Sequence, residues 1–245
     1  MPPPGCWERA AADVSVSPRA QPWYRQAAAR IGQNLPIKML GTPVVIYVFF
    51  LAYGHMLNHP RFPVTEMPPI LLDDLIEFWP PALILYVSLW VYVTLPSALV
   101  SSLRELVYYT WTIGVVCLVG LVCFFLWPTA VPRPGFDRAS YRGFNILTRL
   151  DAAGNACPSL HVATAVFAAI WLDALLSEMR AGGVVRGANW AWCLGILYSA
   201  MATKQHVAID VFAGAALGMV VAVLAVRRRV RAAMPMPPRW RGNDQ

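Results

Sequence analysis

The chain has 245 residues, of which 58% are hydrophobic and only 13% charged, and its mean hydropathy is +0.50. This composition excludes an ordinary soluble globular protein and indicates a membrane protein. The formal net charge is +7, but Lys and Arg gather at the ends of apolar segments, without the interleaved aromatic residues of a nucleic-acid-binding patch. We therefore expect membrane lipids, and no nucleic acid, among its partners.

The first segment, residues 1–38, is predicted to be cytoplasmic and partly disordered, because residues 1–22 are polar and rich in proline. Residues 23–38 are ambiguous. Four apolar residues fall on one helical side and three polar ones on another, which fits either a helix on the inner membrane surface or a loop. These residues are Trp23, Ala27, Ile31 and Leu35, and Arg25, Arg30 and Gln33.

Six apolar runs are long enough to cross about 30 Å of hydrocarbon, which takes roughly 17–25 residues each. Their approximate limits are 40–57, 79–98, 105–128, 158–178, 188–204 and 207–226. A backbone exposed to lipid must satisfy its own hydrogen bonds, so every run is predicted to be a helix. The expected fold is an all-α integral membrane bundle of six transmembrane helices, with a domain at 39–228 and a basic cytoplasmic tail at 229–245.

Lys and Arg near the span ends predict the orientation. Cations are concentrated in the N-terminal segment and the C-terminal tail, whereas the 58–78 loop is acidic. Six spans place both ends on one side, so both termini are predicted to be cytoplasmic, in a bacterial inner (plasma) membrane. The cations are Arg9, Arg19, Arg25, Arg30 and Lys38 in the first segment, and Arg227, Arg228, Arg229, Arg231, Arg239 and Arg241 in the tail.

The loop at 129–157 departs from this pattern, because it is predicted to lie outside and yet is basic. It carries Arg133, Arg138, Arg142 and Arg149 against Asp137 and Asp151. Either a span is misplaced, or the surface tolerates the charge, or these side chains bind an anion on the outer face.

The stretch N-A-C-P-S-L-H, residues 155–161, joins this loop to the fourth predicted span. Pro158 suits the first turn of a helix, so Ser159 and His161 are expected near the helix N-terminus. Free backbone N–H groups and the positive end of the helix dipole favour an anion there, and the serine hydroxyl adds a donor. A phosphate group is the expected ligand.

A second group of polar residues lies in T-K-Q-H-V-A-I-D, residues 203–210, between the fifth and sixth predicted spans. His206 and Asp210 are four residues apart and share one helical face, so the carboxylate can orient the imidazole and leave its other nitrogen free to attack. Lys204 adds positive charge. Two histidines with separate roles suit phosphoryl transfer through a covalent intermediate, and no metal or other cofactor is required.

Together, P-S-L-H and K-Q-H-x-x-x-D resemble the second and third signature motifs of the type 2 phosphatidic acid phosphatase superfamily, the lipid phosphate phosphatases. The wording is closest to the branch that includes inositolphosphotransferases of sphingolipid synthesis. The resemblance covers about residues 127–218 and implies a metal-independent enzyme acting on a lipid phosphate or pyrophosphate at the outer face.

Carried over by position, the resemblance implies His206 as the nucleophile, Asp210 as its orienting partner and His161 as the general acid. Ser159 would contact the phosphate. W-P-T-A-V-P-R-P, residues 127–134, resembles the end of the first signature motif, which makes Arg133 its phosphate-binding arginine.

Two positions depart from the phosphatase pattern. Leu126 stands where the pattern has a lysine, and Ala200 where it has an arginine. Lys204 is a candidate to replace the second, and Arg138, Arg142 or Arg149 to replace the first. These departures put simple phosphatase activity in doubt more than the fold.

Two alternatives stay open from sequence. The chain could be a non-catalytic membrane protein, a transporter or a lapsed family member that binds lipid phosphate. His55 and His59, four residues apart, could hold a metal ion, but no third ligand accompanies them and interfacial histidines are the favoured interpretation.

Overall fold

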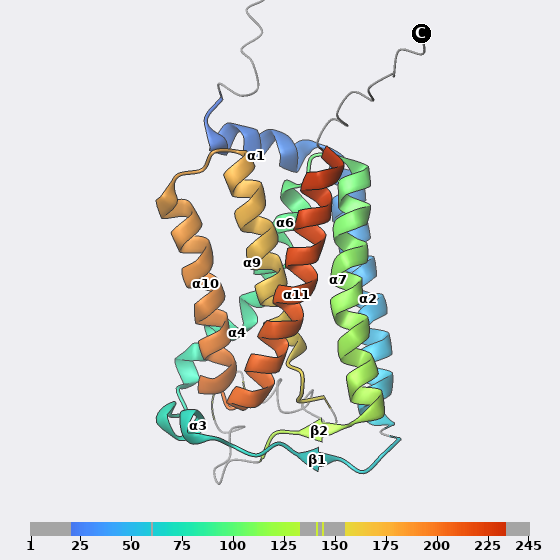
Figure 1. Ribbon diagram of the computed structural model, residues 1–245, viewed down its shortest axis with the longest axis vertical. Helices are drawn as coiled ribbons and strands as arrows, with labels where there is room; N and C mark the ends of the chain where they lie inside the picture. Colours follow the sequence, from blue (N-terminus) through green and yellow to red (C-terminus); the bar gives the residue numbers. More distant parts are fainter. Residues whose placement is uncertain (1–20, 60, 133–140, 142–143, 145–154, 234–245) are drawn as a thin grey trace, which may run out of the picture.

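The computed structural model describes residues 21–59, 61–132, 141, 144 and 155–233, and this part of the chain is almost entirely helical. Long helices run along a common direction, one helix lies across one end of the bundle, and two very short strands lie at the other end (Figure 1). The predicted all-α class is therefore confirmed.

In chain order the helices are α1 (Trp23–Gly32), α2 (Leu35–Asn58), α3 (Leu71–Leu75), the 3₁₀ turn η2 (Pro80–Ala82), α4 (Leu83–Val87), α5 (Leu89–Tyr92), α6 (Leu95–Leu99), α7 (Leu103–Leu126), α9 (Leu160–Glu178), α10 (Gly183–Ala202) and α11 (Ala208–Ala233). The strands are β1 (Thr65–Glu66) and β2 (Thr129–Ala130), which pair in parallel.

Within the described part of the chain, five segments are long and apolar enough to cross a membrane: Leu35–Met56, Pro80–Leu99, Leu103–Leu126, Leu160–Glu178 and Ala208–Arg231. They correspond to five of the six predicted spans. The sixth, predicted at 188–204, is covered by α10, which packs beside α9 but contains Arg186 and Asn189 and does not meet this description. The count of six spans stays a prediction.

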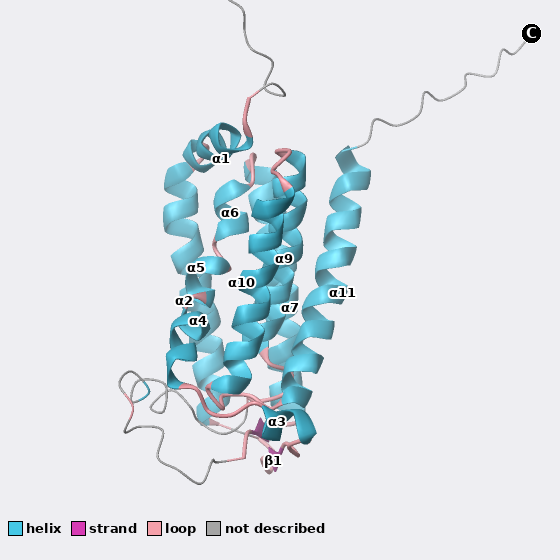
Figure 2. Ribbon diagram, turned by 90° about the vertical axis from the view of Figure 1, so that its left-hand side faces the viewer, coloured by secondary structure: helices cyan, strands magenta, loops and turns pink. Residues whose placement is uncertain are grey.

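The second predicted span is not one regular helix, because η2, α4, α5 and α6 divide it into short pieces (Figure 2). Pro80, Pro81 and Pro96 have no N–H group to continue a helical ladder. The hydroxyls of Ser88 and Ser97 donate to backbone carbonyls three residues earlier, at 2.6 and 2.8 Å. Irregular backbone at membrane depth is tolerated where it is buried in protein or lines a cavity.

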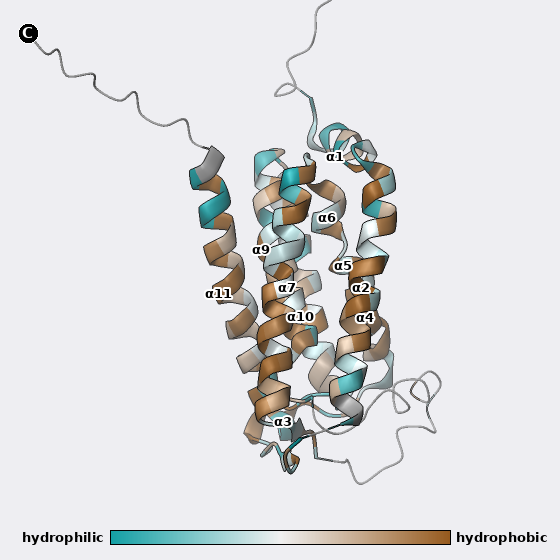
Figure 3. Cartoon of the chain, turned by 90° about the vertical axis from the view of Figure 1, so that its right-hand side faces the viewer, coloured by the Kyte–Doolittle hydropathy of each residue, from teal (hydrophilic) through white to brown (hydrophobic). Residues whose placement is uncertain are grey.

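Helix α9 is the central helix of the bundle. It is apolar on all sides, most of its residues are buried, and it contacts α5, α6, α7, α10 and α11. By contrast, α2 and α7, which include long hydrophobic stretches (Figure 3), carry many exposed apolar side chains, among them Leu40, Tyr47, Val107 and Trp111. An apolar surface of this extent fits contact with lipid.

Glycines allow α11 to approach α9 closely. A Cβ atom at Gly214 would overlap the backbone carbonyl oxygen of Ser159, and one at Gly218 would overlap that of Ala163. The neighbouring atoms are backbone, so they cannot move aside as a flexible side chain could. The G-A-A-L-G stretch at 214–218 is thus a small-residue packing face, as the sequence predicts.

At the end of the bundle where α1 lies, buried polar contacts join several helices. The Lys38 ammonium donates to the carbonyl oxygens of Arg30, Ala98 and Val100 at 2.7, 2.8 and 2.9 Å. The Arg229 guanidinium pairs with Glu105 and Glu178, and so joins α11 to α7 and α9.

The ambiguity at residues 23–38 is resolved in part, since residues 23–32 form α1. Trp23 and Ala27 pack against the buried core around α9, so the apolar side of α1 contacts the bundle itself.

We predict that Gly218→Ala lowers the free energy of unfolding by about 1–3 kcal/mol, because the added methyl overpacks the α9–α11 contact. Gly187→Ala in α10 is the matched control: its added Cβ meets open space, so the helix should gain about 0.4–1 kcal/mol. Both changes in the free energy of unfolding are to be measured in detergent, with unfolding followed by circular dichroism. Equal stabilities of the two variants would contradict the close approach.

Candidate active site

The end of the bundle opposite α1 is where α9 and α11 begin, beside β1, β2 and α3 (Figure 1). Thr129, fully buried in β2, holds the segment that leads into α9. Its carbonyl oxygen accepts from the Ala156 N–H at 3.0 Å and its hydroxyl oxygen accepts from the Cys157 N–H at 2.8 Å. The strands therefore fix the approach to the P-S-L-H motif.

Ser159 is the N-cap of α9. Its hydroxyl oxygen accepts from the Val162 N–H at 3.3 Å, which satisfies one of the free N–H groups of the first turn. His161, in that turn, stacks on Tyr86 of α4 with 3.9 Å between ring centroids and 7° between ring planes. This stack fixes the plane of the imidazole.

His206 and Asp210 meet at the start of α11. The His206 Nδ1 atom lies 3.6 Å from Oδ2 of Asp210, slightly longer than a hydrogen bond. The same Oδ2 accepts from the Val207 N–H at 3.1 Å, so the carboxylate also caps the helix. The fully buried Asp210 thus faces one side of the imidazole, and Nε2 lies on the other.

One backbone hydrogen bond joins the two motifs, since the Ser159 N–H donates to the Asp210 carbonyl oxygen at 3.0 Å. Behind it, the glycine face of α11 keeps the two helices in contact. His161 and His206, distant in sequence, consequently line one cavity of about 260 Å³.

Three buried polar atoms at this place have no hydrogen-bond partner within the described residues: Nε2 of His161, Nδ1 of His206 and Oδ1 of Asp210. Unpaired buried polar atoms are uncommon in folded proteins, and a ligand is one reason for them. The two imidazoles line one cavity and Asp210 lies against His206, so the three residues mark a candidate catalytic site.

Lys204 ends α10 in the left-handed conformation, with φ of 53°. Its ammonium donates to the carbonyl oxygens of Asp73 and Ile76 at 2.8 and 2.5 Å, so the structure directs it towards the loop around α3. A contact with phosphate stays a prediction for this residue.

The other predicted cations, Arg133, Arg138, Arg142 and Arg149, lie outside the described residues.

Of the two departures from the phosphatase pattern, Leu126 is exposed at the end of α7. Ala200 is fully buried, and its carbonyl oxygen accepts from the N–H groups of Gln205 and His206, both at 3.1 Å.

Sequence reasoning missed the roles of Asp73 and Tyr86. One carboxylate oxygen of Asp73 accepts from the Ala208 N–H at 2.7 Å, at the positive end of α11, and the other accepts from the Ile70 N–H at 2.8 Å. Tyr86 supports His161. One acidic residue among several in the segment between two apolar runs, and a tyrosine within an apolar run, carry no local signal for either role.

Across the described residues, no three His, Cys, Asp or Glu side chains gather as metal ligands would. His55 and His59 stack with ring centroids 4.9 Å apart, and the carbonyl oxygen of His55 lies 3.0 Å from Nδ1 of His59. This pair lies apart from the residues that line the cavity.

Fold and site together define a helical membrane protein with a paired-histidine candidate site at one end of its bundle. Comparison with protein families matches residues 105–233 to the PAP2 superfamily, and the chain belongs to that superfamily. Its members are phosphatases, which supports a phosphoric ester hydrolase. The match does not distinguish an inositolphosphotransferase-like branch. A search among curated proteins finds no match.

We predict that Cys157 reacts slowly with maleimides at pH 8. The residue is 8% exposed, and burial, with the Asp210 carboxylate nearby, raises the pKa of its thiol to about 11. The reactive thiolate is then rarer than in an exposed cysteine by roughly a hundredfold.

The measurement is the labelling rate of a variant whose only cysteine is Cys157, followed from pH 7 upward by mass spectrometry. Val64→Cys, made in a cysteine-free chain, is the control, because Val64 is exposed in the loop at the same end. Comparable rates at pH 8 would show that Cys157 is not shielded.

Proposed function

We propose that the protein is a lipid phosphate phosphatase or phosphotransferase that works through a phosphohistidine intermediate at the non-cytoplasmic face. The observation that carries the proposal is the pair of imidazoles lining one cavity, each with one buried ring nitrogen, and a buried carboxylate against one of them. Membership of a phosphatase superfamily supports the reaction class.

In the first step, Nε2 of His206 attacks phosphorus, and the bond between phosphorus and the leaving oxygen breaks. His161 donates a proton to that oxygen, so the leaving group departs as a neutral alcohol. Asp210 stabilises the positive charge that develops on the attacking imidazole. Ser159, N–H groups in the first turn of α9, Lys204 and Arg133 are the proposed donors to the phosphate oxygens.

In the second step, an acceptor oxygen attacks phosphorus, the P–N bond to His206 breaks, and His161 takes the proton of the acceptor. Water as acceptor gives hydrolysis and release of inorganic phosphate. A lipid or polyol hydroxyl gives phosphoryl transfer. The two reactions use the same residues and differ only in the acceptor.

Two features support a lipid substrate. The cavity that holds both imidazoles continues between α2, α5 and α7 as an apolar space, lined by Phe49, Phe50, Leu89, Val93 and Ile113 among others. Helices long and apolar enough to span a membrane flank that space, which supports a position at membrane depth. A phosphate at the histidines would therefore lie at the interface while its hydrocarbon part stays among the helices.

The rival proposal is a non-catalytic protein that binds lipid phosphate, and Leu126 and Ala200 are its support. Turnover separates the two proposals, since a binding protein releases and transfers nothing.

We predict that the purified protein turns over at least one member of a panel of phosphorylated lipids in the presence of a metal chelator. His206→Ala should lower turnover by at least about 100-fold, because the attacking atom is lost. Asp210→Asn, which keeps the shape but not the charge, should lower it less. His55→Ala is the matched control, because His55 is exposed and lies outside the cavity.

Released phosphate and lipid products are both measured, the latter by mass spectrometry, so that transfer without release is detected. The intermediate should appear as an acid-labile, alkali-stable phosphate on the peptide that contains His206. Full activity of His206→Ala would rule out the proposed nucleophile. Absence of turnover on the whole panel would favour the binding protein.

Orientation has a separate test, with single cysteines introduced at opposite ends of the bundle. Val64 lies in the loop before α3, and Val184, 88% exposed, lies in the first turn of α10. We expect an impermeant thiol reagent to label Val64→Cys on intact cells and Val184→Cys only after permeabilisation. The reverse pattern would place the candidate site on the cytoplasmic side.

A further inference from the structure

The cavity behind the two histidines extends far beyond what a phosphate needs. Its lining residues on α2 run from Tyr53 to Thr42, eleven residues apart, which is about 16 Å at 1.5 Å per residue. His161 and His206 mark its end near the strands, and Thr42, Thr94, Ser97 and Thr110 mark its opposite end. The space is a long slot parallel to the helices.

Polar groups that already have partners line the far end of the slot. The Thr94 hydroxyl donates to the Val91 carbonyl at 2.8 Å, and the Ser97 hydroxyl donates to the Thr94 carbonyl at 2.8 Å. One turn beyond Thr42, the Lys38 ammonium joins α2 to the carbonyls of Ala98 and Val100 at the end of α6. These contacts hold α2 against the end of α6 just beyond the last lining residues of the slot.

The size of the slot restricts what fits. A volume of about 260 Å³ lies just below the roughly 300–1,000 Å³ of typical small-molecule sites. With this length and an aromatic and aliphatic lining, it suits one slender hydrocarbon chain rather than two chains or a ring system.

We propose that this cavity binds one hydrocarbon chain of the phosphate substrate, and that its polar end near Thr42 and Ser97, where Lys38 joins α2 to α6, limits the length of chain accepted. This inference rests on the proposed function, because it takes the phosphate to sit at the histidines. It adds that the length of the cavity, as well as recognition of the phosphate headgroup, determines which substrates the protein accepts.

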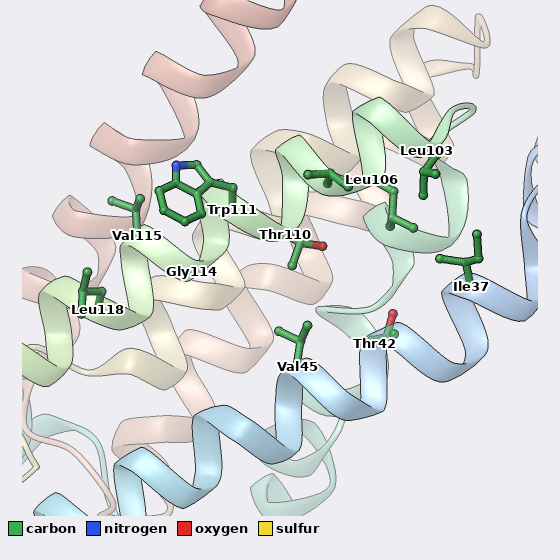
Figure 4. A pocket seen from close by; sticks show the side chains of 12 residues that line it. Ile37, Thr42, Val45, Leu103, Leu106, Thr110, Trp111, Gly114, Val115 and Leu118 are labelled. Carbon is green, nitrogen blue, oxygen red and sulfur yellow. The ribbon is translucent and has the colours of Figure 1, made fainter.

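Gly114 of α7 offers a way to shorten the slot. It lines the cavity, and a Cβ added there meets nothing within 4 Å. It also borders a second, shallower apolar groove between α2 and α7, shown in Figure 4 with Ile37, Thr42 and Val45 on one helix and Trp111 and Leu118 on the other. Gly41 of α2 lines only that groove, which makes it a matched control position.

The first experiment compares turnover of a short-chain and a long-chain alkyl phosphate. We expect Gly114→Leu to lower turnover of the long-chain ester by about tenfold relative to the short-chain ester, because the added side chain occupies the slot. Gly41→Leu fills only the groove, and Gly187→Leu lies at neither place, so both should keep the wild-type ratio. An unchanged ratio in Gly114→Leu, or the same change in all three variants, would overturn the inference.

The second experiment does not depend on turnover and uses the wild-type chain. A long-chain alkyl phosphate with a diazirine at the end of its chain is photolysed with the protein, and adducts are mapped by mass spectrometry. We expect adducts on the peptides that contain Thr94, Ser97 and Ile113, and fewer with the alcohol of the same chain. Adducts confined to exposed residues such as Val107, or equal labelling by the alcohol, would mean that the space holds bilayer chains.

The two experiments separate the failures. If no phosphate ester is turned over but phosphate-dependent labelling of the slot persists, the proposed function fails and the chain site stands. If esters are turned over but chain length has no effect in Gly114→Leu, the proposed function stands and the chain site fails.

Discussion

The contact between α9 and α11 is the constraint on which the candidate site depends. Two glycines of α11 rest on backbone carbonyls of α9, and the Ser159 N–H donates to the Asp210 carbonyl at the point where both helices begin. Neither helix could shift along the other by a turn without losing both features. Because His161 and His206 lie within the first residues of their segments, the same contact that packs the bundle brings them to one cavity.

Polar groups inside the bundle are mostly paired, which makes the exceptions informative. Tyr92 donates to the Asn189 side chain at 2.6 Å, and Arg186 forms two hydrogen bonds with Asp173, at 2.8 and 2.7 Å. Such pairs join helices where hydrophobic association is weak. Six buried side-chain atoms of the described residues have no hydrogen-bond partner; three lie on Trp171, Gln205 and Arg229, and three lie on His161, His206 and Asp210. Under the proposed function, a substrate in the cavity would supply partners to the imidazoles of the second group.

Sequence patterns predicted the parts of this architecture that are local. Long apolar runs gave the helical class and five of the spans, and the G-A-A-L-G stretch gave a packing face that the structure confirms. The spacing of His206 and Asp210 predicted their contact, because four residues make about one helical turn. The family resemblance is confirmed as well.

Most of the contacts that the sequence did not predict join residues far apart in the chain. Asp73 caps α11 from α3, more than a hundred residues away, and Tyr86 stacks on His161 from a different helix. The helix at 80–99 is also broken, by three prolines and by hydroxyls that bond to the local backbone. The hydrophobicity of this run predicts a span but does not predict the breaks. Lys38 is predicted to be one of the cytoplasmic charges, and the sequence does not show that its ammonium is bound to the carbonyl oxygens of Arg30 in α1 and of Ala98 and Val100 at the end of α6. The roles of the site residues stay predictions.

Arg229 shows how one residue can serve two stages in the life of a membrane protein. Positive residues beside a hydrophobic segment bias which side it stays on while the chain is being inserted, before any tertiary structure exists. In the finished bundle the same guanidinium is paired with Glu105 and Glu178 and lies over the ring of Trp171, 5.5 Å from its centroid. On the proposed orientation, a charge that first helps to set topology afterwards fastens the last helix to its neighbours, so a substitution there would disturb biogenesis and packing at once.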